Sequence, residues 1–109
     1  MNKKTITPEW IDEASDMVGG LRSLRKSICK ALAITEKELM SNKRDDHLVN
    51  GRHSFVMISG EQFPLASTEI ISIMIGRDRS TLNHYKRYAA MTHKQLFVEN
   101  VKKAIAWQI

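Results

Sequence analysis

A single glycine between an apolar segment and a basic one constrains the fold of this chain more than any other feature. Residues 67–91 run STEIISIMIGRDRSTLNHYKRYAAM, and the apolar part ends at Gly76. Asp78 is then well placed to cap a new helix, because a carboxylate there accepts from the free N–H groups of the first turn. Two helices joined by about three residues with a glycine in the turn match the helix-turn-helix pattern. We therefore predict a recognition helix over residues 78–91.

The predicted recognition helix is polar and basic on most of its surface. Leu82, Tyr85 and Ala89 are spaced at i, i+3 and i+7, so they form one narrow apolar stripe that can anchor the helix to a core. The side chains that suit contact with DNA surround its start: Arg77, Arg79, Ser80, Thr81, Asn83 and His84.

The distribution of charge supports the same interpretation. The net charge is +5. Residues 77–109 hold seven basic and two acidic residues, whereas residues 1–76 hold ten of each. The whole excess therefore lies on the predicted recognition helix and the segment after it. A one-sided positive field attracts polyanions and supplies the sequence-independent part of DNA affinity, although a solvated basic face without a partner has the same composition.

The remaining patterns are helical, and we predict an all-α domain over residues 1–109 with six or seven helices. An extra helix should start at Pro8 and end at Gly19-Gly20, so that residues 21–109 form the core. Residues 21–32 favour a second helix, and residues 48–59 a longer one that ends in a break at residues 60–64. Thr35 followed by Glu38 indicates a capping box on a short helix, and Thr92 with Gln95 another that opens the last helix.

Several functional classes are disfavoured by the sequence. No apolar run approaches the roughly 20 residues of a membrane span, there is no secretory signal, and the lone Cys29 favours a reducing, cytoplasmic setting. The histidines and Cys29 show no close-spaced ligand pair, so no metal or other cofactor is expected. A GxxxxGK[ST] loop for nucleotide phosphates is absent. Ser80 and His84 share a helix face, but no oxyanion hole or pocket is indicated, so an enzyme is not expected.

Three pieces of the chain resemble one family. ITEKELMS (residues 34–41) resembles a short helix of the form V-x-x-x-D-L-L-S, and Arg52 resembles the arginine that opens a long middle helix. EIISIMIGRDRSTLNHYKR (residues 69–87) resembles the signature E-I-G-x-x-F-G-G-R-D-H-S-T-V-x-H. Together they resemble the C-terminal DNA-binding domain (domain IV) of the bacterial replication initiator DnaA, whose helix-turn-helix is Trp-repressor-like. The resemblance covers about half of the chain directly.

This resemblance implies a set of DNA-contacting residues. The family's Arg-Asp-His-Ser-Thr run reads bases in the major groove, and the residues that match it here are Arg77, Asp78, Arg79, Ser80 and Thr81. The loop arginine that enters the minor groove is matched by Arg44, beside Lys43. Arg52 matches a further basic contact, although a surface pairing with a neighbouring aspartate is an equal alternative. The other expected contacts are Ser67 and Thr68 at the start of the first motif helix, and Lys86, Arg87, Lys94, Lys102 and Lys103 on phosphates.

The chain also departs from the family pattern. Arg79 stands where the family has histidine, and an arginine fork favours guanine or a phosphate. Asp45 and Asp46 occupy a loop that is rich in Arg and Ser in the family, and Ile71 and Ile75 replace two glycines. These differences bear on which DNA sequence is preferred.

Two hypotheses from different classes follow. The first is a sequence-preferring double-stranded DNA-binding protein that acts in replication-origin recognition or transcriptional regulation, a role that would suit a phage or mobile element. The alternative is a protein-interaction module that binds a host replication or transcription protein through its acidic first helix and its apolar Trp107-Gln108-Ile109 end.

Overall fold

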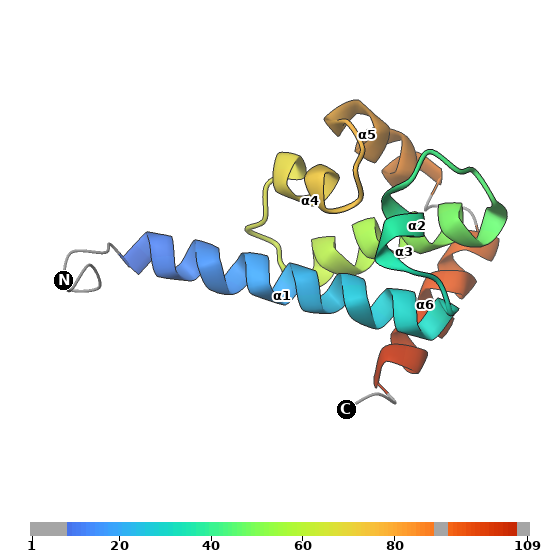
Figure 1. Ribbon diagram of the computed structural model, residues 1–109, viewed down its shortest axis with the longest axis horizontal. Helices are drawn as coiled ribbons and strands as arrows, with labels where there is room; N and C mark the ends of the chain where they lie inside the picture. The colour runs from blue at the N-terminus through green and yellow to red at the C-terminus, as the bar shows by residue number, and fades with distance from the viewer. Residues whose placement is uncertain (1–8, 89–91, 107–109) are drawn as a thin grey trace.

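In a computed structural model the chain folds into α-helices joined by short loops (Figure 1). The structure describes the backbone of residues 9–88 and 92–106 and the side chains of residues 16–87 and 95–106. Within these ranges there are six helices and no strand, so the predicted all-α class is confirmed. They are α1 (Glu9–Leu32), α2 (Glu36–Met40), α3 (Asp46–Gln62), α4 (Thr68–Met74), α5 (Arg79–Tyr88) and α6 (Thr92–Ala106).

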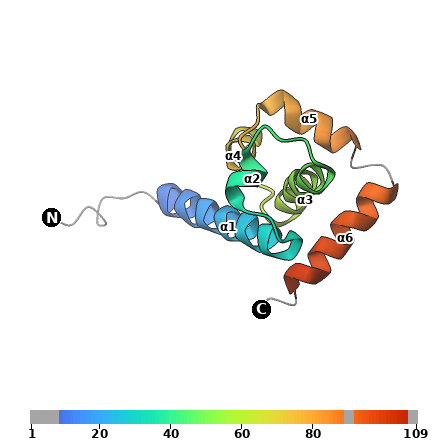
Figure 2. The same cartoon turned by 45° about the vertical axis from the view of Figure 1, so that its right-hand side comes forward.

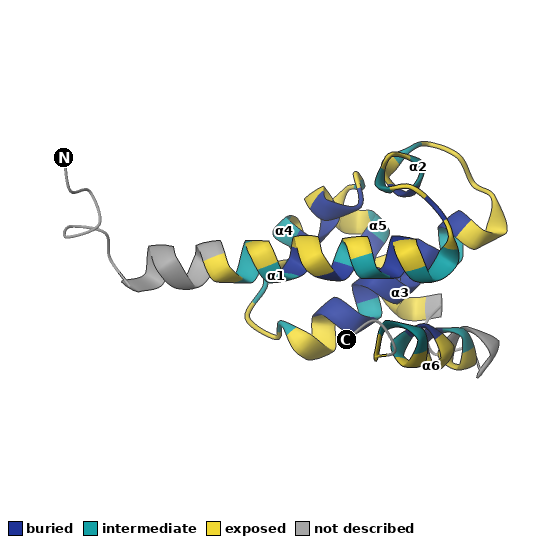
Figure 3. Cartoon of the chain, turned by 60° about the horizontal axis from the view of Figure 1, so that its bottom comes forward, coloured by how far each residue is buried: buried dark blue, intermediate teal, exposed yellow. Residues whose placement is uncertain are grey.

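The centre of the molecule is α3. It contacts α1, α2, α5 and α6, and Figure 2 shows it inside a ring formed by the other helices. Most residues between Gly51 and Ser59 are buried, so this helix is covered on nearly every side (Figure 3). Its apolar residues Leu48, Phe55 and Ile58 lie in the core, where each is 0% exposed. A helix without a solvated face cannot be stable by itself, so its neighbours determine where it lies.

The predicted break at Gly19-Gly20 is wrong, because α1 runs through both glycines as one helix. Two glycines cost a helix only about 1 kcal/mol each. The C-terminal half of α1 buries Leu21, Leu24 and Ile28, and this burial offsets the cost of the two glycines. A Cβ on Gly20 would lie 2.6 Å from the ring of Phe63, so this glycine lets the α3–α4 loop pack on the helix.

The helix ends around α2 follow local chemistry closely. After α1, the N–H of Ile34 donates to the carbonyl of Cys29 at 3.0 Å and that of Ala33 to Lys30 at 3.3 Å, a Schellman pairing with Ala33 at φ 56°. The predicted capping box of α2 is confirmed: the Glu38 N–H donates to Thr35 Oγ1 and the Thr35 N–H to Glu38 Oε1, both at 3.0 Å.

The long middle helix differs from its predicted bounds at both ends. It begins at Asp46, two residues before the predicted start, and it passes through Gly60 to end at Gln62. Apolar content marks only the buried part of such a helix, and its first two and last three residues are exposed. The predicted break at residues 60–64 is therefore shorter, and the chain leaves the helix at Phe63.

Two short helices, α4 and α5, are separated by a tight turn at Gly76. The Ser67 hydroxyl caps α4 by accepting from the Ile70 N–H at 3.1 Å. The Gly76 N–H donates to Ile73 O at 3.1 Å and the Arg77 N–H to Ser72 O at 2.9 Å, which closes the last turn of α4. Gly76 has φ +64°, the left-handed conformation that glycine adopts without steric cost. The reversal predicted at this glycine is thus present.

Two large apolar residues lie at the surface of these helices. Ile73 on α4 and Leu96 on α6 are each 62% exposed, whereas Ile71, Met74 and Val98 are buried. Residues 89–91 of the predicted recognition helix, with Ala89 of its stripe, lie outside the described residues, as do Trp107, Gln108 and Ile109. Thr92 is the first residue of α6, but its side chain lies outside the described set.

Candidate nucleic-acid interface

α5 presents its polar residues to solvent and its apolar stripe to the core. Leu82 is 0% exposed and Tyr85 7% exposed. The Tyr85 ring meets the ring of buried His53 on α3 edge-on, with centroids 4.5 Å apart and planes at 68°. These contacts fix the rotation of α5 about its axis. Thr81 is half-buried, and the exposed residues of the helix are Arg79, Ser80, Asn83, His84, Lys86 and Arg87.

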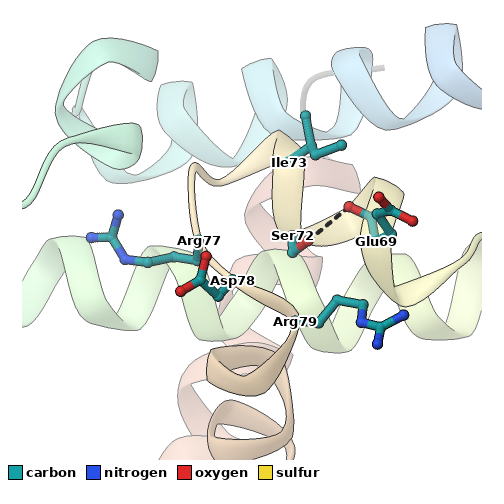
Figure 4. Close-up of a pocket in the computed structure, with 6 residues that line it drawn as sticks. All are labelled: Glu69, Ser72, Ile73, Arg77, Asp78 and Arg79. Atoms are coloured by element: carbon teal, nitrogen blue, oxygen red, sulfur yellow. Dashed lines mark hydrogen bonds between the residues drawn. The ribbon is translucent and has the colours of Figure 1, made fainter.

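A shallow depression separates the start of α5 from α4 (Figure 4). Figure 4 shows Arg77 and Arg79 leaving the turn in opposite directions, with Asp78 between them. The Asp78 carbonyl accepts from the Thr81 N–H at 3.0 Å, so Asp78 stands directly before the helix, as predicted. The depression is lined by Glu69, Ser72, Ile73, Arg77, Asp78 and Arg79. Two carboxylates and two guanidiniums meet there, so this side of α5 is nearly neutral.

A second depression lies on the other side of α5 and has a different charge. It is lined by Arg44, Val49, Arg52, Arg77, Ser80, Thr81, His84 and Tyr85. This set contains three arginines and no carboxylate, so it is the more attractive of the two depressions for an anion. It also brings the loop before α3 next to α5, although Arg44 and Ser80 are 36 residues apart in sequence. The resemblance described above implied that both segments contact DNA.

Arg52 requires a correction, because it is not at the surface. Its side chain is 1% exposed, so neither the predicted DNA contact nor the alternative surface pairing with an aspartate describes it. The guanidinium donates to backbone carbonyls: Nε to Leu39 at 2.6 Å, Nη1 to Lys43 at 2.8 Å, and Nη2 to Ser41 at 2.8 Å and Glu38 at 3.3 Å. These oxygens lie at or just after the end of α2, where a helix leaves carbonyls without internal partners. A buried cation is favourable there because it neutralises the negative end of the helix.

Arg77 is also engaged with the same loop. Its Nη2 donates to the Ser41 carbonyl at 2.6 Å and its Nη1 to its neighbour Gly76 at 3.1 Å. Burial lowers the pKa of Arg52, and the nearby positive charge of Arg77 lowers it further. Half-buried and hydrogen-bonded, Arg77 is less available to a base than its sequence position suggests.

The other predicted DNA contacts lie on the loop before α3 and at the start of α4. Lys43 and Arg44 are exposed on the loop, followed directly by exposed Asp45 and Asp46. Ser67 is exposed and Thr68 half-buried at the start of α4, where Ser67 acts as the cap.

Among the predicted phosphate contacts, Lys102 stands apart. It pairs with Glu61 at 2.6 Å and Glu99 at 3.2 Å, and the Glu61 hydrogen bond raises its pKa. Two carboxylates offset its charge, so it is poorly suited to a phosphate. Lys103 is exposed, and Lys94 has no described side chain.

Comparison with protein-family models, with curated proteins and with solved structures finds no match. Within the described part of the chain, no group of three or more His, Cys, Asp and Glu side chains could hold a metal ion. No helix in that same part has the length and apolar character to cross a membrane.

One important residue carried no signal in the sequence. Arg25 of α1 pairs with Glu36 of α2 through Nε at 2.8 Å, and its Nη1 donates to the carbonyl of Met74, the last residue of α4, at 2.9 Å. It thereby ties three helices together just before the turn at Gly76. In the sequence it is one of several cations on the same helix, and only the three-dimensional packing distinguishes it.

Proposed function

We propose that this chain is a sequence-preferring double-stranded DNA-binding protein, with α4 and α5 as a helix-turn-helix and α5 as the recognition helix. The observation that carries the proposal is the orientation of α5. Leu82 and Tyr85 hold one side in the core, while the first turn presents Arg79, Ser80 and Asn83 outward. An α-helix fits the major groove, and arginine, serine and asparagine are side chains that hydrogen-bond to base edges there.

The loop before α3 supplies the second proposed contact. Lys43 and Arg44 are exposed beside the depression on one side of α5, and this depression is lined by three arginines. Positive charge next to a groove-reading helix attracts the phosphates and contributes sequence-independent affinity. Lys86 and Arg87 in the last turn of α5 extend the same positive surface. Arg52 and Lys102 are left out of the proposed contacts. Arg52 is buried and donates to backbone carbonyls, and Lys102 is paired with two carboxylates.

The biological role that we propose follows from this binding. A protein of this kind would recognise a replication origin or regulate transcription, by occupying a short duplex site. The resemblance of residues 34–86 to the DNA-binding domain of DnaA supports the first of these roles.

Selection of bound fragments from a random duplex pool tests the proposal directly. We expect one enriched sequence, whose affinity falls steeply as salt is raised. Arg79→Ala should cost about 1–3 kcal/mol and relax the preference at one position, if the contact is to a base. Lys26→Ala on α1 is the matched control, since it removes one exposed positive charge from a different helix. If no duplex sequence is enriched and the binding affinity does not change with salt, DNA is rejected as the partner and a protein partner is favoured.

A further inference from the structure

The carbonyl of Ser41 accepts from two arginines that come from different helical elements. Arg52 Nη2 on α3 lies 2.8 Å from it, and Arg77 Nη2, on the turn before α5, lies 2.6 Å from it. One side of this carbonyl is therefore tied to the central helix and the other to the turn. A hydrogen bond from a charged donor is about twice as strong as one between neutral groups, so the pairing is a firm one.

The turn at Gly76 is shaped to bring Arg77 within reach of this carbonyl. A Cβ on Gly76 would lie 2.9 Å from the Met40 carbonyl oxygen, so the bare glycine backbone packs directly on the end of α2. Arg77 follows immediately, and Figure 4 shows its side chain directed away from Arg79. The close approach of Gly76 to Met40 and the hydrogen bond from Arg77 to Ser41 are separate observations that join the same two segments.

We infer that Arg77 is a positioning residue that fixes the loop of residues 41–45 to the start of α5, with Arg52 holding the same loop from beneath. Arg77 is thus set apart from Arg79, which points outward and is the base-reading candidate. The contact itself does not depend on DNA, but its consequence for recognition rests on the proposed function.

The consequence is that two DNA-facing elements approach a duplex as one body. Lys43 and Arg44 lie on the loop, and Ser80 lies on α5. A loop that was free to move would lose conformational entropy on binding, and this loss would subtract from affinity. Fixing it beforehand also sets the spacing between the groove read by α5 and the groove reached by Arg44, which is a determinant of specificity.

Arg77→Ala is the informative variant, with Arg79→Ala as its matched control. Both remove one positive charge from neighbouring positions, but only Arg77 donates to Ser41. Arg52→Ala is a weaker probe, because it removes a buried side chain and four hydrogen bonds to backbone carbonyls at once, and so tests folding.

The first measurement needs no DNA. Backbone ¹⁵N relaxation should give residues 42–44 order parameters near the rigid-backbone value of about 0.85 in the wild type. Arg77→Ala should lower them and shift the Asn42 ¹⁵N resonance, since that nitrogen is bonded to the Ser41 carbonyl carbon. Arg79→Ala should change neither. Arg77→Lys, which keeps a donor, should restore part of the order. Equal loop order in all variants would overturn the inference.

The second measurement is a double-mutant cycle with Arg44→Ala on the selected duplex. The loss caused by Arg44→Ala should shrink by about threefold or more in the Arg77→Ala background, because a loosened loop no longer presents Arg44. In the Arg79→Ala background it should be unchanged within about twofold. Equal losses in both backgrounds would overturn the recognition consequence. If the wild type binds no duplex, the proposed function fails, while loop order alone still decides the positioning role.

Discussion

Replacing Gly76 with alanine should destabilise the fold substantially. At φ +64° the backbone is in the left-handed conformation, which costs a residue with a Cβ about 1–2 kcal/mol. The new methyl group would also stand 2.9 Å from the Met40 carbonyl oxygen, which is backbone and cannot swing aside. Overpacking of this kind typically costs about 1–3 kcal/mol. Alanine lowers the entropy of the unfolded chain, which returns about 0.4–1 kcal/mol. The expected net loss in the free energy of unfolding is about 2–4 kcal/mol.

Two other glycines supply matched controls for this substitution. Gly19 in α1 and Gly60 in α3 are helical and exposed, and a Cβ on either would meet nothing within 4 Å. Alanine at these positions should stabilise the protein by about 0.5–1 kcal/mol, because glycine is the poorer helix former. The same chemical change is therefore expected to have opposite signs at the turn and in the helices.

Urea unfolding followed by circular dichroism at 222 nm measures all three variants on one scale. Wild-type stability of Gly76→Ala would refute the reasoning, since it would mean that the turn relaxes away from α2 without cost. A loss of similar size in all three would also refute it, because glycine position would then not matter. A loss confined to Gly76→Ala would support both the strained φ and the contact with Met40.

Three further predictions concern local chemistry elsewhere in the chain. Ala33→Gly should raise the free energy of unfolding by about 1 kcal/mol, because Ala33 holds φ 56° at an exposed helix end; urea unfolding checks this, and a loss would argue against that conformation. Thr35→Ala should lower the free energy of unfolding by about 1 kcal/mol, because the α2 cap is lost. An unchanged urea midpoint would contradict the capping box. Burial, aided by the nearby Glu36 carboxylate, raises the pKa of Cys29 from 9.0 to about 11. The unfolded thiol therefore ionises first, so stability should fall as pH rises from about 9 toward 11, and Cys29→Ala should lack that slope.

Local sequence chemistry predicted part of the fold because several helix ends and turns in this chain depend on residues that are close in sequence. The Thr35–Glu38 capping box needs only residues within one turn, and the α5 stripe of Leu82 and Tyr85 needs only helical spacing. The reversal at Gly76 also follows from a residue type and its neighbours. These features predicted α5 and the turn before it, whereas the expectation that the loop before α3 works beside α5 came from the resemblance to the DNA-binding domain of DnaA.

The two largest failures involve partners that are distant in sequence. Gly19-Gly20 looks like a helix end until Phe63, more than forty residues away, is seen to pack on Gly20. Arg52 looks like a surface cation because the carbonyls that surround it come from α2 and the following loop. Such contacts depend on how helices pack, and charge or periodicity does not reveal them. The sequence therefore predicted that the first turn of α5 is at the surface, whereas it did not reveal that Arg52 is buried or that Arg77 donates to the Ser41 carbonyl.

Because α3 is buried on nearly every side, fragments of this chain should not fold as the whole chain does. A fragment that held only α4 and α5 would lack the surface on which Leu82 and Tyr85 rest, so it would not retain its shape. Trimming α6 would uncover one flank of the central helix, and trimming α1 would uncover another, because both helices pack against α3. Truncations should thus abolish folding altogether instead of yielding a smaller working piece, and function in this chain is best probed by point substitutions.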